Sequence, residues 1–192
     1  MTYTITTPVP NQPIPSSGFG IAVRNAILDL DSRVATLEAA SQSLLARGRR
    51  ITSTAGVTTT ETGFLRIDNI PVLAGKVYQF LTTNMNVDTT VSNDIADVRL
   101  RLLYSASPGS PATTSSTQIC HMRNTVDDAT QSNVLPLNGF YVPSADGYIS
   151  VLLSVVRVSG SGSIVVFCSG SEILDFTIQD IGTDPGDTGV VI

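Results

Sequence analysis

The sequence predicts a mainly β protein: an antiparallel β-sandwich preceded by an extended arm and one N-terminal helix. Composition supports the sandwich, because 23 Thr and 21 Ser outnumber the 11 basic and 16 acidic side chains. Threonine is favoured on the pleated surface of a strand, whereas Lys and Glu dominate the exposed faces of helices. Short apolar runs separated by turn residues indicate the strands, and one heptad pattern near the N-terminus indicates the helix.

Residues 1–19 are predicted to form the extended arm. They contain four prolines and almost no charge, and proline restricts both its own backbone and that of the preceding residue to extended conformations. A disordered tail is the alternative. Ile5, Val9, Ile14 and Phe19 favour an arm that docks on another surface, because apolar side chains are unfavourable in water.

Residues 20–48 are predicted to form the helix. Its apolar positions follow a 4-3-4-3-4-3 spacing, which Ser41 completes, and they are Val23, Ile27, Leu30, Val34, Leu37 and Leu44. This spacing is typical of a heptad seam, and Gly48 stands where a C-terminal stop is expected. We expect the seam to pair with copies of itself rather than with its own domain. Because β-branched residues stand at a and Leu at d, the seam alone favours a dimer.

Residues 49–180 are predicted to form the sandwich, and residues 181–192 a turn-rich tail. The predicted strands are Phe64–Ile67, Val77–Leu81, Val98–Tyr104, Ile119–Met122, Tyr148–Val158, Ile164–Cys168 and Ile173–Ile178. In the third of these, Arg99 and Arg101 should face outward, since they alternate with apolar residues. The segment 155–167 is predicted to be one hairpin, closed by a Ser/Gly loop.

Charge and hydropathy exclude several classes of partner. The formal net charge is −5 and the isoelectric point is about 4.6, which argues against nucleic acid. No apolar run approaches the ~20 residues needed to span a bilayer, so no membrane partner is expected. The N-terminus has no basic or apolar signal region, so we expect synthesis in the cytoplasm without a signal peptide.

Cysteine and histidine are too few to predict a reactive site. Cys120 and His121 are adjacent on a predicted strand, so their side chains should point to opposite faces and not form a dyad. With Cys168 they provide three zinc ligands at most, without the usual spacing. Both cysteines are expected to be buried apolar residues, and a bond between them is left open for the case in which their strands are neighbours.

The acidic residues also predict no chemistry. Asp94 with Asp97, and Asp127 with Asp128, are paired acids that calcium could use, but they lack the spacing of a calcium loop. We expect them to be solvated loop residues. The sequence therefore predicts no catalytic, cofactor-binding or metal-binding residue and no cofactor, and we expect that the protein is not an enzyme.

One stretch resembles a known family of β domains. Gly139–Tyr148 is similar to the signature of C1q- and TNF-like jelly rolls, with Phe140, Pro143, Gly147 and Tyr148 at the matching positions. The resemblance implies a jelly roll in which Pro143 and the Gly-Tyr pair mark the turn into a central strand. It also implies that the domains assemble as trimers, in contrast to the dimer that the seam alone favours.

A second stretch resembles the N-termini of actinobacteriophage virion proteins, namely head fibres, capsid decoration proteins and minor tail proteins. The similar segments are Pro8–Pro15, Val23–Asn25 and Leu28–Glu38. This resemblance implies an arm that anchors a homotrimer to major capsid or tail proteins, and a β-domain displayed on the virion surface. It leaves open whether the particle site is capsid or tail. A minor tail module that binds a receptor or a host surface carbohydrate is the alternative.

Overall fold

The computed structural model describes residues 18–40, 43–126 and 133–184. Residues up to 40 and residues from 41 onward form two separate compact units. In chain order the elements are α1 (Gly18–Ala40), β1 (Ser43–Arg50), β2 (Thr62–Val72), β3 (Lys76–Thr83), β4 (Asn86–Thr89), β5 (Asp94–Ser105), β6 (Thr117–Val126), β7 (Asn133–Val134), β8 (Asn138–Tyr141), β9 (Gly147–Ser159), β10 (Ile164–Phe167) and β11 (Leu174–Thr183).

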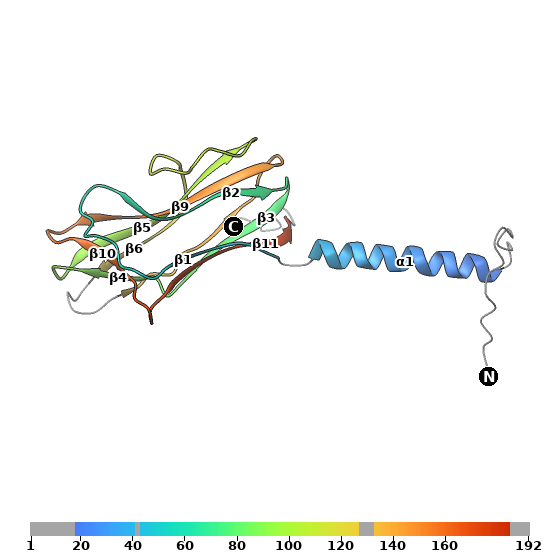
Figure 1. Cartoon of the computed structure of the whole chain (residues 1–192), viewed down its shortest axis with the longest axis horizontal. Helices are drawn as coiled ribbons and strands as arrows, with labels where there is room; N and C mark the ends of the chain where they lie inside the picture. Colours follow the sequence, from blue (N-terminus) through green and yellow to red (C-terminus); the bar gives the residue numbers. More distant parts are fainter. Residues whose placement is uncertain (1–17, 41–42, 127–132, 185–192) are drawn as a thin grey trace, which may run out of the picture. The chain divides into compact units, whose positions relative to one another are not determined.

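The second unit is an antiparallel β-sandwich. Sheet A has the strand order β1-β11-β3-β8, sheet C has the order β2-β9-β5-β6, and the smaller sheet B has the order β10-β4-β7. Sheets A and C face each other, and the chain crosses between them repeatedly (Figure 1). Two four-stranded sheets joined in this way make a jelly roll, which confirms the predicted fold class.

The core lies between sheets A and C and follows from the alternation along their strands. On sheet A, Phe80 and Phe176 are fully buried and stack with their ring centroids 6.4 Å apart. On sheet C, Leu100 and Leu153 lie opposite each other in neighbouring strands and are also fully buried. Strand β9 is the exception to alternation, since eight consecutive residues of it are buried. It is the central strand that the Gly-Tyr signature predicts.

The seven predicted strands are confirmed, but their pairing differs in one place. Segment 155–167 is not a hairpin, because β9 belongs to sheet C while β10 pairs with β4 in sheet B. The loop between them therefore carries the chain from one sheet to another. The short strands β4 and β7 are not predicted by the sequence, since two to four residues are too few to show alternation.

The predicted end of the helix is wrong. The sequence predicts a helix over residues 20–48, whereas α1 runs from Gly18 to Ala40 and strand β1 begins at Ser43. The reason is tertiary: residues 43–50 form a ladder with β11, and this pairing overrides the heptad spacing. Leu44 consequently lies on a strand, and Gly48 is a strand residue that packs beside Ile67 instead of a helix stop.

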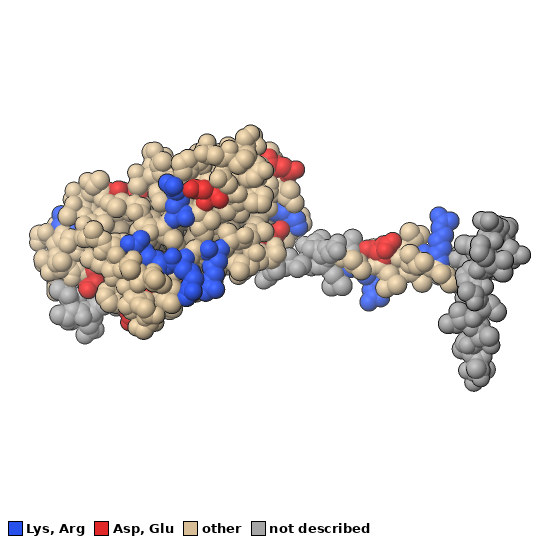
Figure 2. Space-filling view, viewed as in Figure 1, with Lys and Arg blue, Asp and Glu red and all other residues tan. Residues whose placement is uncertain are grey.

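The domain boundaries shift accordingly. The sandwich begins at residue 43 instead of 49, and β11 extends to Thr183, so the predicted tail over 181–192 begins inside a strand. Residues 185–192 lie outside the described residues. Most of the sandwich face drawn in Figure 2 is uncharged, in keeping with the 14% charged residues of the sequence, and Lys and Arg side chains gather near its middle. None of the helical residues that the structure describes could serve as a membrane span.

Candidate functional site

Four apolar side chains of the α1 heptad seam are exposed in the part of the chain that the structure describes. Val23, Ile27, Leu30 and Val34 are 43%, 53%, 55% and 49% exposed. Leu37 also lies in α1, and Leu44, on β1, is 57% exposed. The structure thus keeps five of the six predicted oligomerisation positions on the helix and moves the sixth to a strand.

The predicted anchoring residues are only partly covered by the structure. Ile5, Val9 and Ile14 lie outside the described residues. Phe19 lies in the first turn of α1, so it belongs to the helix rather than to an extended arm. The predicted boundary between arm and helix therefore moves from residue 19 to residue 17.

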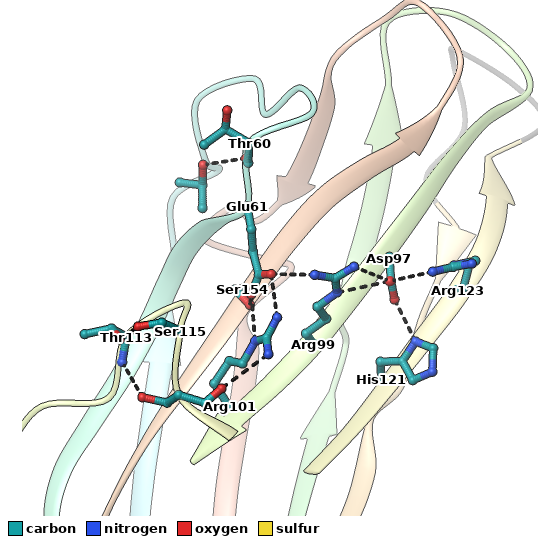
Figure 3. Close-up of polar contacts among 12 residues, drawn as sticks. Thr60, Glu61, Asp97, Arg99, Arg101, Thr113, Ser115, His121, Arg123 and Ser154 are labelled. Carbon is teal, nitrogen blue, oxygen red and sulfur yellow. Dashed lines mark hydrogen bonds and ion pairs between the residues drawn. The ribbon is translucent and has the colours of Figure 1, made fainter. Parts of the chain in front are cut away.

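A charged network covers part of the outer face of sheet C (Figure 3). Its centre is Glu61, the residue immediately before β2, whose carboxylate accepts hydrogen bonds from three side chains. Arg101 donates from Nε to Oε1 at 2.9 Å and from Nη2 to Oε2 at 2.7 Å. Arg99 donates to Oε2 at 2.5 Å, and the hydroxyl of Ser154 donates to Oε1 at 2.6 Å. Glu61 thereby links strands β2, β5 and β9.

Asp97 continues the network towards β6. Its carboxylate is buried, and Oδ2 accepts bonds from Arg99 at 2.9 and 3.1 Å and from Arg123 at 3.1 Å. The Nδ1 atom of His121 lies 2.9 Å from Oδ1. An ionised carboxylate only accepts, so Nδ1 carries the proton in this pair. Asp97 is therefore not the solvated loop residue that the sequence predicts, because basic groups from two strands compensate its charge.

The two carboxylates of the network are held in their ionised form. Burial raises the pKa of Glu61, but hydrogen bonds from Arg101, Ser154 and Arg99 outweigh burial and lower that pKa from 4.5 to about 2. Burial likewise raises the pKa of Asp97, and bonds from His121, Arg99 and Arg123 lower it below its usual value. A general acid at neutral pH needs a raised pKa. The two ionised carboxylates are therefore not general acids at neutral pH, and they act as a clamp between strands.

Asp94 is a second buried carboxylate, at the first residue of β5. The hydroxyl of Thr89 donates to it at 2.6 Å, and the backbone amides of Ser161 and Gly162 donate at 2.9 and 3.3 Å. Burial raises the pKa of Asp94, but these three bonds outweigh burial and lower it. The prediction that Asp94 is solvated is wrong, because the loop between β9 and β10 wraps around its carboxylate. The other acidic pair, Asp127 and Asp128, lies outside the described residues.

The cysteines are not bonded to each other. Cys120 is half-buried on β6 of sheet C, Cys168 is buried just after β10 of sheet B, and both are free thiols. Burial raises the pKa of Cys120 to about 11, so its thiol is protonated at neutral pH. Within the described ranges, no group of three or more His, Cys, Asp or Glu side chains could hold a metal ion.

A pocket of about 210 Å³ lies between the end of β1 and the start of β2. Its single ionisable lining group is Arg50, whose Nη1 donates to the carbonyl of Phe64 at 2.7 Å and whose Nη2 donates to the carbonyl of Ser53 at 3.2 Å. An acid–base or nucleophilic site needs at least two complementary groups in one place. This pocket has one, and that one ties the carbonyl of Ser53, in the loop after β1, to the carbonyl of Phe64 in β2.

Sequence reasoning missed Glu61, although it predicted that Arg99 and Arg101 face outward. Glu61 stands alone in a threonine-rich stretch before β2, and no spacing relates it to two arginines of β5. The outward alternation of arginines on a buried strand was the available signal, because such arginines need a carboxylate to compensate them.

Comparisons with known proteins do not assign the chain to a family. No protein-family model matches the chain, and no curated protein matches it in sequence. Among solved structures, the chain is similar to the CBM22-1 xylan-binding domain of Paenibacillus barcinonensis Xyn10C, with 11% identity, 76% of this chain and 99% of that chain covered, and a TM-score of 0.39.

Two further solved structures are similar at the same low level. Eiger TNF from S. frugiperda has 8% identity, 78% of this chain and 100% of that chain covered, and a TM-score of 0.33. The VP2 subviral particle of infectious bursal disease virus has 12% identity, 74% and 37% covered, and a TM-score of 0.32. At these values the likeness carries no functional argument, and the jelly roll itself rests on the strand order of this chain.

Proposed function

We propose that the chain is a structural protein of a bacteriophage virion: a homotrimeric decoration or fibre protein that displays the jelly roll outward. Residues 1–17 anchor it to a major capsid or tail protein, and α1 assembles the trimer. The observation that carries the proposal is the uncovered heptad seam of α1, Val23, Ile27, Leu30 and Val34. The resemblance of the N-terminal segments to phage virion proteins supports the part of the proposal that places the chain in a virion.

The seam supports association with copies of the same chain rather than with an unrelated surface. Apolar residues at a strict 3.5-residue spacing form a narrow stripe, which matches an identical stripe on a neighbouring helix. Arg33 stands at a g position and Glu38 at the e position of the following heptad. In parallel coiled coils these two positions face each other across neighbouring helices, so the pair favours helices that run in the same direction.

The free energy available from the α1 seam is small compared with the cost of association. Each of its four exposed side chains still shows about half its surface, so burying it contributes about 1 kcal/mol. Association has an unfavourable entropy of at least ~4 kcal/mol per step. Three heptads therefore approach the minimum for a stable coiled coil, and contacts outside α1 should contribute.

The decisive experiment is the mass of the purified chain by light scattering after size exclusion. We expect three times 20.2 kDa. The double variant Leu30→Asp/Val34→Asp should run as a monomer, because its carboxylates would be buried without partners. The matched control is Asp31→Asn/Ser32→Ala, which changes the same turn outside the a and d positions and should stay trimeric. A wild-type chain that runs as a monomer contradicts the proposal.

Anchoring is tested by deleting residues 1–17, which leaves all of α1 in place. The truncated chain should remain a folded trimer and should no longer bind particles that lack the wild-type protein. If it binds them at wild-type occupancy, the anchor lies elsewhere in the chain. A receptor- or carbohydrate-binding role is the alternative function, and saturable glycan binding by the trimer would favour it.

A further inference from the structure

One outward-facing row crosses all four strands of sheet A. The ladder pairs Leu44 of β1 with Gln179 of β11, Gln179 with Gln79 of β3, and Gln79 with Phe140 of β8. The neighbouring rows alternate: Tyr78, next to Gln79 in β3, points into the core. The four residues Leu44, Gln179, Gln79 and Phe140, named here the Leu44–Phe140 row, therefore lie side by side on the outer face.

The composition of this row is that of an interface rather than of a solvated surface. Its two ends are large apolar side chains, Leu44 at 57% and Phe140 at 53% exposed, and its middle holds two half-buried glutamines. None of the four carries a charge. Val142, just beyond β8, extends the apolar end and is 40% exposed. Aromatic residues are enriched in interfaces and charged residues are depleted from interface centres.

The short link between α1 and β1 favours a second copy of the chain as the partner that covers the row. The helix ends at Ala40 and β1 begins at Ser43, so three peptide units separate them and span at most about 11 Å. If three copies of α1 lie side by side as a bundle, each of the three β1 strands must begin within about 11 Å of the end of its own helix. Leu44 is the second residue of β1, so chain length alone brings the Leu44 ends of the three copies close to the bundle, and Phe140 lies three strands further along the row.

We infer that the Leu44–Phe140 row is covered by a second copy of the chain, as a contact between jelly rolls that supplements the short α1 seam. The inference rests on the proposed trimer. A closed three-fold ring requires two different patches to meet at each contact. The row provides two different apolar ends on opposite edges of sheet A, with amide groups between them that can exchange hydrogen bonds.

The first test is hydroxyl-radical footprinting of the full chain, comparing the wild type with Leu30→Asp/Val34→Asp. Both changes lie in α1, outside the compact unit that holds the row. Phe140 should be oxidised at least ~5-fold more slowly in the wild-type trimer than in the monomeric variant. Met122 on β6, in sheet C, is an exposed internal control and should react at the same rate in both.

The second test weakens the row without touching α1. Phe140→Ser in the full chain should raise the concentration at which the trimer dissociates by at least ~10-fold. The matched control is Val134→Ser on β7, an exposed apolar residue outside the row, which should leave that concentration unchanged. Because Phe140 is exposed in the single chain, its replacement should not affect folding, which circular dichroism checks.

The outcomes separate this inference from the proposed function. A wild-type monomer overturns both, and it is seen in the mass before any footprinting. A trimer in which Phe140 reacts as fast as in the monomeric variant, and in which Phe140→Ser behaves like Val134→Ser, leaves the α1 assembly standing and overturns the contact through the row.

Discussion

Arg101 and Glu61 form a bidentate ion pair on the outer face of sheet C. Nε and Nη2 of the guanidinium lie 2.9 and 2.7 Å from the two carboxylate oxygens, and the side chains are 15% and 13% exposed. Two parallel N–H···O bonds to one carboxylate give both energy and a fixed geometry. The strands β2 and β5 are not neighbours in the sheet, so this pair clamps them across β9.

Replacing Glu61 by Gln should lower the free energy of unfolding by roughly 2–3 kcal/mol. The change leaves Arg99 and Arg101 with fewer charged partners in a largely buried position, and breaking such pairs is strongly destabilising. Urea denaturation at pH 7 measures it. The control Arg66→Gln removes an exposed pair with Asp68 and should cost less than about 1 kcal/mol. Equal effects of the two changes would contradict the clamp.

Stability should fall in acid through the same residues. The pKa of Glu61 is about 2 in the folded chain against 4.5 ordinarily, so the unfolded chain binds the proton more readily. The stabilisation is therefore complete above pH 4.5 and is lost as the pH falls from 4.5 towards 2. The lowered pKa values of Asp97 and Asp94 act in the same direction. Urea midpoints at several pH values should show this loss, with a shallower slope for Glu61→Gln.

Gly160→Ala should destabilise the chain more than Gly109→Ala. Both glycines have positive φ, +101° and +120°, so an alanine at either position has a strained backbone. At Gly109 a Cβ would meet nothing within 4 Å, whereas at Gly160 it would lie 1.7 Å from Oδ1 of Asp94. The excess should be at least ~2 kcal/mol, because the loop must leave the buried carboxylate. Thermal melts of both variants suffice, and equal melting temperatures would mean that the loop does not depend on Asp94.

Reducing agent should leave the melting temperature unchanged, and so should a chelator. Cys120 and Cys168 are free, so a reductant has no bond between them to break. With a pKa of about 11, Cys120 should also react slowly with alkylating reagents at pH 7 in the folded chain, and quickly in urea. A drop of several degrees with a chelator would reveal a metal ion that holds the fold together.

One-sided burial explains why β3, β11 and most of β5 could be predicted from the sequence, because buried and less buried residues alternate along them. The sequence did not predict β1. The heptad spacing continues through Leu44, and only the ladder with β11, distant in sequence, makes that segment a strand. For the same reason the burial of Asp94 and Asp97 was missed. Their compensating groups come from other strands and from a loop, and no local pattern relates them.

The candidate site also has a part that a local sequence pattern predicts and a part that depends on the order of the strands. The seam of α1 is a local pattern, so five of its six positions could be assigned from the sequence alone. The network around Glu61 and the Leu44–Phe140 row depend on which strands become neighbours, and strand order is a property of the whole chain. The resemblance at Gly139–Tyr148 predicted a jelly roll, but not the register that places Gln79 beside Phe140.

The late position of β9 and β11 in the chain determines when the jelly roll can form during synthesis. Strand β1 pairs with β11, and β2 pairs with β9, so both early strands lack these partners until the last third of the chain has been made. At roughly 5–20 residues per second this delay is on the order of ten seconds. Helix α1 precedes every strand in the chain, and its backbone hydrogen bonds need no later segment. If the chain forms the proposed trimer, neighbouring nascent chains on one messenger RNA should therefore join through their helices before any jelly roll closes.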